Sequence, residues 1–111
     1  MTVGFELDGL PFPGLNGGPM FKFSEAVSMI VNCEDQKEID HYWDRLCADG
    51  GKPSRCGWLK DKFGFSWQIV PASLSAMMTD KDAARSQRVF AALMEMTKID
   101  LARLRQAYDG A

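Results

Sequence analysis

Residues 56–71 decide the fold and read CGWLKDKFGFSWQIVP. We expect one strand around residues 55–59 and a second over residues 65–70, the latter rich in aromatic and β-branched side chains. The residues between them, 60–64, include Asp and Gly and are typical of a turn. Pro71 should end the second strand, because proline has no N–H to continue a strand ladder. The stretch therefore predicts a hairpin-like set of strands.

Residues 26–33 predict a further strand upstream, because they form a β-branched-rich run of strand length. Side chains alternate across a strand, so one face should be fully apolar and meet helices: it holds Val27, Met29, Val31 and Cys33. The other face mixes polar and apolar groups, as a ligand-facing wall often does: it holds Ala26, Ser28, Ile30 and Asn32. In the strand at 65–70, Ser66, Gln68 and Val70 share one face, and Phe65, Trp67 and Ile69 share the other.

A helix is predicted between these strands, from Asp35 to about residue 48. The Asp35 carboxylate can accept an early helix N–H, while Glu38 reaches back to the cap. Gly50 and Gly51 supply a left-handed stop. The apolar residues recur at helical spacing in one stripe, formed by Ile39, Tyr42, Trp43, Leu46 and Cys47. We expect this stripe to pack on the apolar face of the strand at 26–33.

Both ends of the chain have simpler patterns. Residues 2–8 alternate like a strand, and Asp8-Gly9 is a turn signal. The proline and glycine content of residues 10–19 permits at most a short edge strand followed by a loop. Residues 72–111 are expected to be helical. They should form a short helix near 74–78, a helix over 82–97, and a last helix capped by Asp100 and stopped by Gly110.

Composition excludes several classes of protein. The chain has 111 residues, a formal net charge of −2 and 46% apolar residues, which fits one globular domain. It has no basic block of the kind a nucleic-acid groove needs, and no apolar run long enough to span a membrane. The N-terminus does not resemble a signal peptide. Cys33, Cys47 and Cys56 form no Cys-x-x-Cys motif, so we interpret them as buried free thiols of a cytoplasmic protein.

Several stretches together resemble one family. They are LNGGP at 15–19 with FKF at 21–23, VNCEDQ at 31–36, Tyr42-Trp43, the block at 56–71, and the helical tail with Ala84, Val89 and Tyr108. The chain resembles the PhnB-like group of the vicinal oxygen chelate superfamily, which is related to glyoxalase I and bleomycin-resistance proteins. Such sequences are often labelled 3-demethylubiquinone-9 3-methyltransferase-like. The resemblance covers essentially the whole chain.

The resemblance implies an α+β fold built from a βαβββ module of the glyoxalase/bleomycin-resistance type. Two such modules normally pair within a chain around a central cavity. We expect a single PhnB-like domain over residues 1–111, in which residues 26–71 form the second module. Residues 2–18 match only the last two strands of the first module, so the first module is expected to be incomplete, and residues 72–111 form a helical tail.

An incomplete first module predicts a homodimer. The strand at 26–33 would otherwise present an open edge, which native proteins cover. A second copy related by a two-fold axis could supply the missing partner and complete the cavity. The strand at 2–8 and the helical tail could cross over to the other copy, as in domain swapping.

The superfamily metal site is not expected here. Its enzymes typically hold a divalent ion with His and Glu side chains, and the ion polarises the substrate. In the second module the matching positions offer Ala26 or Ser28 and Gln68, which are weak replacements for imidazole and carboxylate. The single histidine, His41, should lie on the helix surface, and one ligand does not make a site. We therefore predict no metal and no cofactor.

Five residues are candidates for lining a cavity: Ser28, Asn32, Gln68, Cys56 and Trp58. The three polar ones could hydrogen-bond a small ligand, or each other and trapped water. Trp58 could stack on a ligand, although packing in the core is the commoner role of a large aromatic residue. Cys56 has no histidine near it in sequence to activate the thiol, so a nucleophilic role is poorly supported.

These patterns favour a metal-free small-molecule-binding protein of the superfamily without an assigned activity. Two alternatives stay open: a metal-dependent lyase, isomerase or dioxygenase with unrecognised ligands, and a structural dimerisation module without any ligand. Methyl transfer is not predicted, because the sequence has no glycine-rich strand-to-helix turn followed by an acidic residue.

Overall fold

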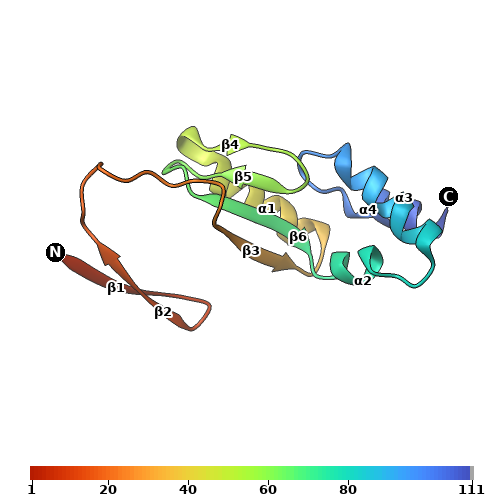
Figure 1. The fold of residues 1–111 in the computed structure, drawn as a ribbon, viewed down its shortest axis with the longest axis horizontal. Coiled ribbons are helices and arrows are strands. Elements are labelled where there is room, and N and C mark those ends of the chain that lie inside the picture. The colour runs from red at the N-terminus through yellow and green to blue at the C-terminus, as the bar shows by residue number, and fades with distance from the viewer. Residues whose placement is uncertain (111) are drawn as a thin grey trace.

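Two separate β-sheets and a helical tail make up the computed structural model, which describes residues 1–110 (Figure 1). The architecture is α+β, as predicted. A two-stranded hairpin lies at one end, a four-stranded sheet lies in the middle, and the helical tail lies at the other end. Within residues 1–110, no helix combines the length and the apolar character that crossing a membrane requires.

The hairpin consists of β1 (Thr2–Leu7) and β2 (Leu10–Leu15), which pair antiparallel. Asp8 and Gly9 connect them with positive φ angles of 52° and 80°, as a tight two-residue hairpin turn requires. The rings of Phe5 and Phe12 stack across the pair with their centroids 5.6 Å apart. The predicted strand, turn and short second strand are therefore confirmed.

The four-stranded sheet has the order β3-β6-β5-β4. Its strands are β3 (Ser28–Cys33), β4 (Lys52–Pro53), β5 (Trp58–Lys60) and β6 (Ser66–Pro71). The pair β3–β6 is parallel and the other two pairs are antiparallel. With helix α1 (Gln36–Cys47) after β3, the chain order is βαβββ, which matches the glyoxalase-like module expected from the resemblance. The strand β3 lies at one edge of the sheet, so one side of its backbone is unpaired.

Helix α1 covers one face of this sheet. Asp35 caps it by accepting a hydrogen bond from the Glu38 N–H at 2.9 Å. The core beneath the helix contains Cys33, Ile39, Trp43, Leu59 and Ile69. The stripe packs on the sheet as predicted except for Tyr42. On the facing strand, Val27 does not take part and is 66% exposed, because β3 begins one residue after it.

The end of α1 differs from the prediction. The helix ends at Cys47, and the first left-handed residue after it is Asp49, with φ 56°, in a short 3-10 turn. Gly50 follows with φ 107°, whereas Gly51 has an ordinary negative φ of −64°. Aspartate tolerates the left-handed region better than most residues, so the chain turns earlier than the glycine pair suggested.

The strand expected at 55–59 is wrong in its first half. Cys56 and Gly57 have φ angles of 60° and 85°, far from the values of about −120 to −140° in regular strands. Their N–H groups donate instead to the carbonyls of Met96 and Thr97, at 2.8 and 2.9 Å. Contacts with the distant helical tail therefore override the local pattern, and the strand starts only at Trp58.

The turn between β5 and β6 is organised by Asp61. Its Oδ1 accepts hydrogen bonds from the N–H groups of Phe63 and Phe65, at 2.9 and 3.0 Å. Its Oδ2 accepts one from Trp67 Nε1 at 2.9 Å. One carboxylate thus fixes both the predicted turn and the orientation of an indole beneath α1.

The helical tail comprises α2 (Leu74–Met78), α3 (Ala83–Met94) and α4 (Leu101–Asp109). Asp100 caps α4 and Gly110 ends it with φ 79°, as predicted, whereas α3 stops three residues before the expected end. The tail has its own core, formed by Met77, Val89, Leu93, Met96, Ile99, Leu101 and Leu104. Gln36 of α1 joins the tail to the sheet, because its side chain binds the Ile99 carbonyl and the Leu101 N–H.

Candidate functional site

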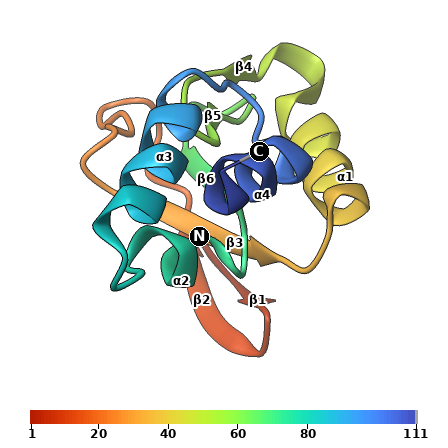
Figure 2. The same cartoon turned by 90° about the vertical axis from the view of Figure 1, so that its right-hand side faces the viewer.

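The face of the sheet opposite α1, called the open face here, is turned toward the viewer in Figure 1, with α1 behind it. Viewed along the long axis, α1 and α3 project on opposite sides of the strands (Figure 2). Strand pairing places two rows of side chains on the open face. One row is Ile30, Gln68 and Trp58, and the other is Ser28, Ser66, Lys60 and Lys52. Because Ile30 is 56% exposed, this face carries apolar surface that no element of the described chain buries.

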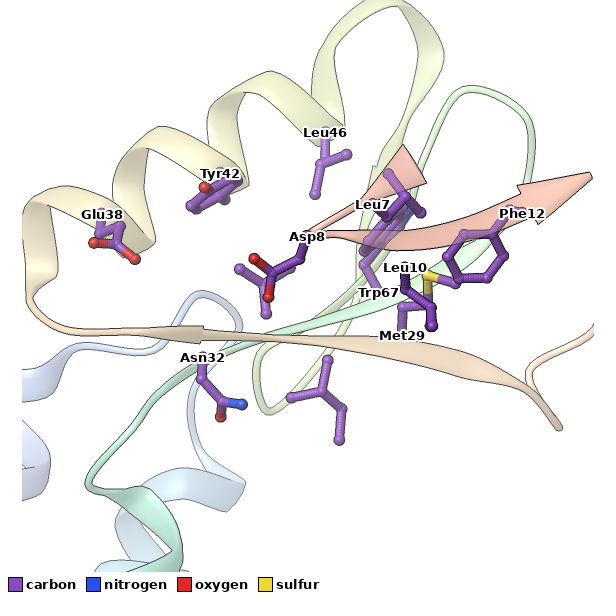
Figure 3. Close-up of a pocket in the computed structure, with 12 residues that line it drawn as sticks. Leu7, Asp8, Leu10, Phe12, Met29, Asn32, Glu38, Tyr42, Leu46 and Trp67 are labelled. Atoms are coloured by element: carbon purple, nitrogen blue, oxygen red, sulfur yellow. The ribbon is translucent and has the colours of Figure 1, made fainter. Parts of the chain in front are cut away.

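Two of the predicted site residues lie in direct contact on the open face. Gln68 Nε2 donates a hydrogen bond to Ser28 Oγ at 2.9 Å. The two side chains therefore satisfy part of each other's hydrogen-bonding capacity, one of the two possibilities that the sequence left open. An amide retains its carbonyl oxygen and one N–H for another partner. Asn32 is exposed further along β3 and points away from α1 (Figure 3).

Ser66 is a feature of the open face that sequence reasoning missed. Its side chain is only 1% exposed, and its Oγ has no hydrogen-bond partner within residues 1–110. It borders a cavity of about 240 Å³, called the small pocket here, which is lined by Glu25, Lys52, Pro53, Ser54, Trp58, Leu59, Lys60 and Ser66. The alternation of 65–70 had placed Ser66 on the same face as Gln68, but nothing in the sequence indicated that its hydroxyl would be buried.

A larger hollow lies elsewhere, along the unpaired edge of β3 (Figure 3). This edge groove, of about 740 Å³, runs between the hairpin and α1. Its lining comprises Leu7, Asp8, Leu10 and Phe12 of the hairpin, residues 29–32 of β3, Glu38, Tyr42 and Leu46 of α1, and Trp67. Of the predicted site residues only Asn32 contributes to it. Tyr42, predicted to pack in the stripe, is 38% exposed and faces this groove instead.

The two remaining candidates lie apart from the Ser28–Gln68 pair. Trp58 lines the small pocket, half-buried. Cys56 packs against the core of the helical tail, and its Sγ lies 3.8 Å from Met94 Sδ. The structure therefore does not gather the five predicted residues into one cavity.

Of the three thiols, Cys33 is buried as predicted, whereas Cys47 and Cys56 are only partly buried. Burial raises the pKa of Cys33 to about 11 and also raises the pKa of Cys47. Both are therefore protonated at neutral pH and are poor nucleophiles. His41 is exposed on α1, with its ring edge-on to Tyr42 at 5.3 Å.

The residues present do not fit a divalent-metal site of the superfamily type. The matching positions carry the Ser28 hydroxyl and the Gln68 amide, which hydrogen-bond each other. Throughout the described part of the chain, no three His, Cys, Asp or Glu side chains lie close enough together to hold an ion. Hydroxyl and amide groups alone are weak ligands for the transition metals of such enzymes.

Comparison with known proteins gives a consistent picture. Residues 1–70 match the family model described as 3-demethylubiquinone-9 3-methyltransferase. Among solved structures, the PhnB protein from Bacillus cereus is similar, with 31% sequence identity and a TM-score of 0.55. That likeness covers 63% of this chain and 64% of the other. No curated protein matches the chain.

Proposed function

The chain belongs to the 3-demethylubiquinone-9 3-methyltransferase family and its PhnB-like group, and from that premise we propose that it binds a small molecule on the open face without a metal ion. The observation that carries the proposal is the hydrogen-bonded pair Ser28–Gln68, in which Gln68 lies between the apolar side chains of Ile30 and Trp58 in the strand register. A few convergent polar groups on an apolar wall are the usual composition of a ligand site. We place the protein in the cytoplasm, where its three free thiols would stay reduced.

The arrangement supports binding better than it supports a reaction. A hydroxyl and an amide can orient a ligand through hydrogen bonds, but neither serves as a strong base or nucleophile without activation. Cys56, which packs against the core of the helical tail, contacts Met94 rather than a base. We therefore assign Ser28 and Gln68 to ligand recognition and propose no catalytic step.

We propose further that the protein works as a homodimer, because two apolar surfaces of one chain face each other without filling the space between them. The apolar face of the hairpin carries Val3, Phe5 and Leu10, which are 59, 46 and 59% exposed. Across the edge groove lie the apolar side chains of Met29, Tyr42 and Leu46, beside the unpaired backbone edge of β3. An isolated hairpin is marginally stable, and an open strand edge invites pairing. A second copy, with or without exchange of the hairpin, would cover both and enclose the open face.

Ligand binding is testable by thermal shift against a panel of metabolites, because a ligand that binds only the folded state raises the melting temperature. We expect Gln68→Ala to abolish the shift that a binding compound produces. Gln106→Ala, which removes the same side chain from the exposed surface of α4, should leave the shift unchanged.

A panel without any hit on the intact protein would favour a structural dimerisation module instead. Metal analysis of protein purified without a histidine tag covers the other alternative, since a stoichiometric divalent ion would contradict the metal-free proposal.

The dimer is testable by light scattering at micromolar concentration. We expect a mass of about twice 12.4 kDa for the unmodified chain. Phe5→Lys should shift the protein to the monomer, because it places a charge on the apolar face of the hairpin. Phe63→Lys makes the same change at a side chain that is 74% exposed in the β5–β6 turn, and it should leave the mass unchanged. A stable monomer of the unmodified protein would overturn the dimer.

A further inference from the structure

We propose that the small pocket is the part of the ligand site that binds a carboxylate group, so that the ligand is a small monoanionic acid with an apolar body. This inference rests on the proposed function, because the pocket continues the open face at the β4–β5 side of the sheet. It adds the chemical class of the ligand, which neither the family nor the Ser28–Gln68 pair specifies.

The first support is a row of donors across all four strands. Lys52 pairs with Lys60, Lys60 with Ser66, and Ser66 with Ser28 in the strand register. Residues directly opposite each other in a sheet project from the same face. Two ammonium groups and a hydroxyl therefore project from adjacent positions, and the small pocket is lined by these same three residues. Such a row of donors is suited to binding an oxyanion.

The second support is the unsatisfied hydroxyl of Ser66. Burial without a hydrogen-bond partner is uncommon for a polar side chain and costs free energy. Ser66 is 1% exposed and lines the cavity, and its Oγ has almost no access to bulk water. A ligand oxygen that enters the wall of the pocket far enough to reach Ser66 Oγ would satisfy this donor, and a carboxylate oxygen is among the strongest acceptors available.

The charge of the pocket selects a monoanion. Lys52 and Lys60 contribute two positive charges, and Glu25, which forms an ion pair with Lys60, contributes one negative charge. One positive charge is left over. A carboxylate balances it, whereas a phosphate dianion would exceed it and be repelled by Glu25. Charge matching of this kind decides specificity among otherwise similar ligands.

The size and the aromatic wall of the pocket indicate the rest of the ligand. A cavity of about 240 Å³ suits a small molecule rather than a nucleotide or a lipid. Trp58 lines the cavity and is half-buried, which leaves part of its indole free to stack on an apolar or aromatic group. Benzoate is therefore a suitable probe, with benzamide as its neutral counterpart and inorganic phosphate as the competing anion.

The test measures benzoate binding to the full chain by calorimetry and by amide chemical shifts. We expect binding by the unmodified protein and about tenfold weaker binding by both Ser66→Ala and Lys52→Gln, because each removes one hydrogen bond to a charged group. Lys62→Gln, in the β5–β6 turn outside the pocket, should change the affinity less than twofold. Glu25→Gln should tighten binding severalfold, since it removes the competing negative charge. Ser66→Ala should fold like the unmodified protein, because it deletes a hydroxyl that makes no hydrogen bond within residues 1–110.

The outcomes separate this inference from the function on which it rests. Equal binding of benzoate and benzamide, preferred binding of phosphate, or equal affinity in the Ser66→Ala and Lys62→Gln variants would overturn the carboxylate subsite. If benzoate does not bind while other compounds shift the Gln68 amide, the inference is wrong and the proposed function stands. If no compound of any class perturbs the open face, both are wrong.

Discussion

The hairpin of residues 2–15 and the βαβββ module of residues 28–71 are both β structures, but they differ in what lies on their apolar faces. In the module, α1 buries Ile39 against Ile69 so that neither has any exposed surface. In the hairpin, every residue of β1 is exposed. The radius of gyration, 16.2 Å, exceeds the value of about 13 Å typical of a compact chain of this length. Turn chemistry and cross-strand pairing can thus specify a hairpin, but burial needs a second layer, which only the module has.

The largest expected effect comes from removing an anchor of that second layer. Trp43 is 7% exposed in the core between α1 and the sheet. We expect Trp43→Ala to lower the free energy of unfolding by about 3–5 kcal/mol, as large-to-small changes in cores do. Phe5→Ala in the hairpin should cost less than about 1 kcal/mol in the monomeric state, because the ring is 46% exposed. Urea denaturation of both variants at low protein concentration measures the difference.

Two results with this pair of variants would contradict the difference in packing between the hairpin and the module. A loss below about 1 kcal/mol in Trp43→Ala would show that Trp43 is not a core residue. A loss in Phe5→Ala as large as that in Trp43→Ala would show that the hairpin is packed as tightly as the module. If the loss in Phe5→Ala grows with protein concentration, the hairpin gains its burial from a second copy.

A glycine in each region provides a second contrast. Gly57 has φ 85°, and a Cβ added there would lie 2.9 Å from the Ile69 carbonyl oxygen and 2.8 Å from Ile99 Cδ1. Gly9 has a similar φ of 80°, but a Cβ there would meet nothing within 4 Å. Both alanine variants pay the strain of the left-handed region, and only Gly57→Ala adds a clash. We expect a loss of about 3 kcal/mol for Gly57→Ala and about 1 kcal/mol for Gly9→Ala, measured by thermal denaturation. Equal losses would mean that the backbone around Gly57 relaxes freely.

The same contrast shows what the sequence could predict about the fold. Local signals sufficed wherever local chemistry decides: Asp8-Gly9 predicted its turn, and Asp35 and Asp100 predicted their caps. The strand prediction fails at residues 55–57 because the N–H groups of Cys56 and Gly57 bind the carbonyls of Met96 and Thr97, some forty residues away. No pattern within a short window can report such a tertiary bond. The two-residue strand β4 was missed because it is too short to carry a periodicity.

The site was less predictable than the fold, for a related reason. Alternation along strands placed Ser28, Gln68 and Ser66 on one face correctly, because period-two geometry is a local property. Whether Ser28 and Gln68 would bond each other, and whether Ser66 would be buried without a partner, depends on neighbouring strands and on Glu25 and Lys60. The small pocket is thus a product of strand register, and the sequence alone does not state the register.

A smaller effect is expected at the connection between the module and the helical tail. Gln36 Nε2 donates to the Ile99 carbonyl at 3.0 Å, and its Oε1 accepts from the Leu101 N–H at 2.8 Å. Gln36→Leu should cost about 1–2 kcal/mol, because it leaves two part-buried backbone groups without these partners. Hydrogen exchange at the Leu101 amide should accelerate more than exchange within β6. The control is Gln106→Leu, at an exposed position of α4, which should change stability by less than about 0.5 kcal/mol.

The smallest effect concerns pH and lies within the helical tail. The Tyr108 hydroxyl donates a hydrogen bond to Asp80 Oδ2, and this bond, together with one from the Asp82 N–H, holds the pKa of Asp80 below its ordinary value. A carboxyl with a lowered folded-state pKa stabilises the protein above its unfolded pKa of about 4, and this stabilisation is lost as the pH falls through the folded-state pKa.

Tyr108→Phe keeps the ring that Arg85 contacts but removes the donor. The melting temperature of the unmodified protein should therefore exceed that of the variant at pH 7, and the difference should shrink as the pH falls below about 4. Asp40, whose pKa is lowered by Lys98 and Gln36, titrates alike in both proteins and cancels from the difference. A difference that stays constant down to pH 2 would show that the Tyr108 hydroxyl acts on stability by a route other than the charge of Asp80.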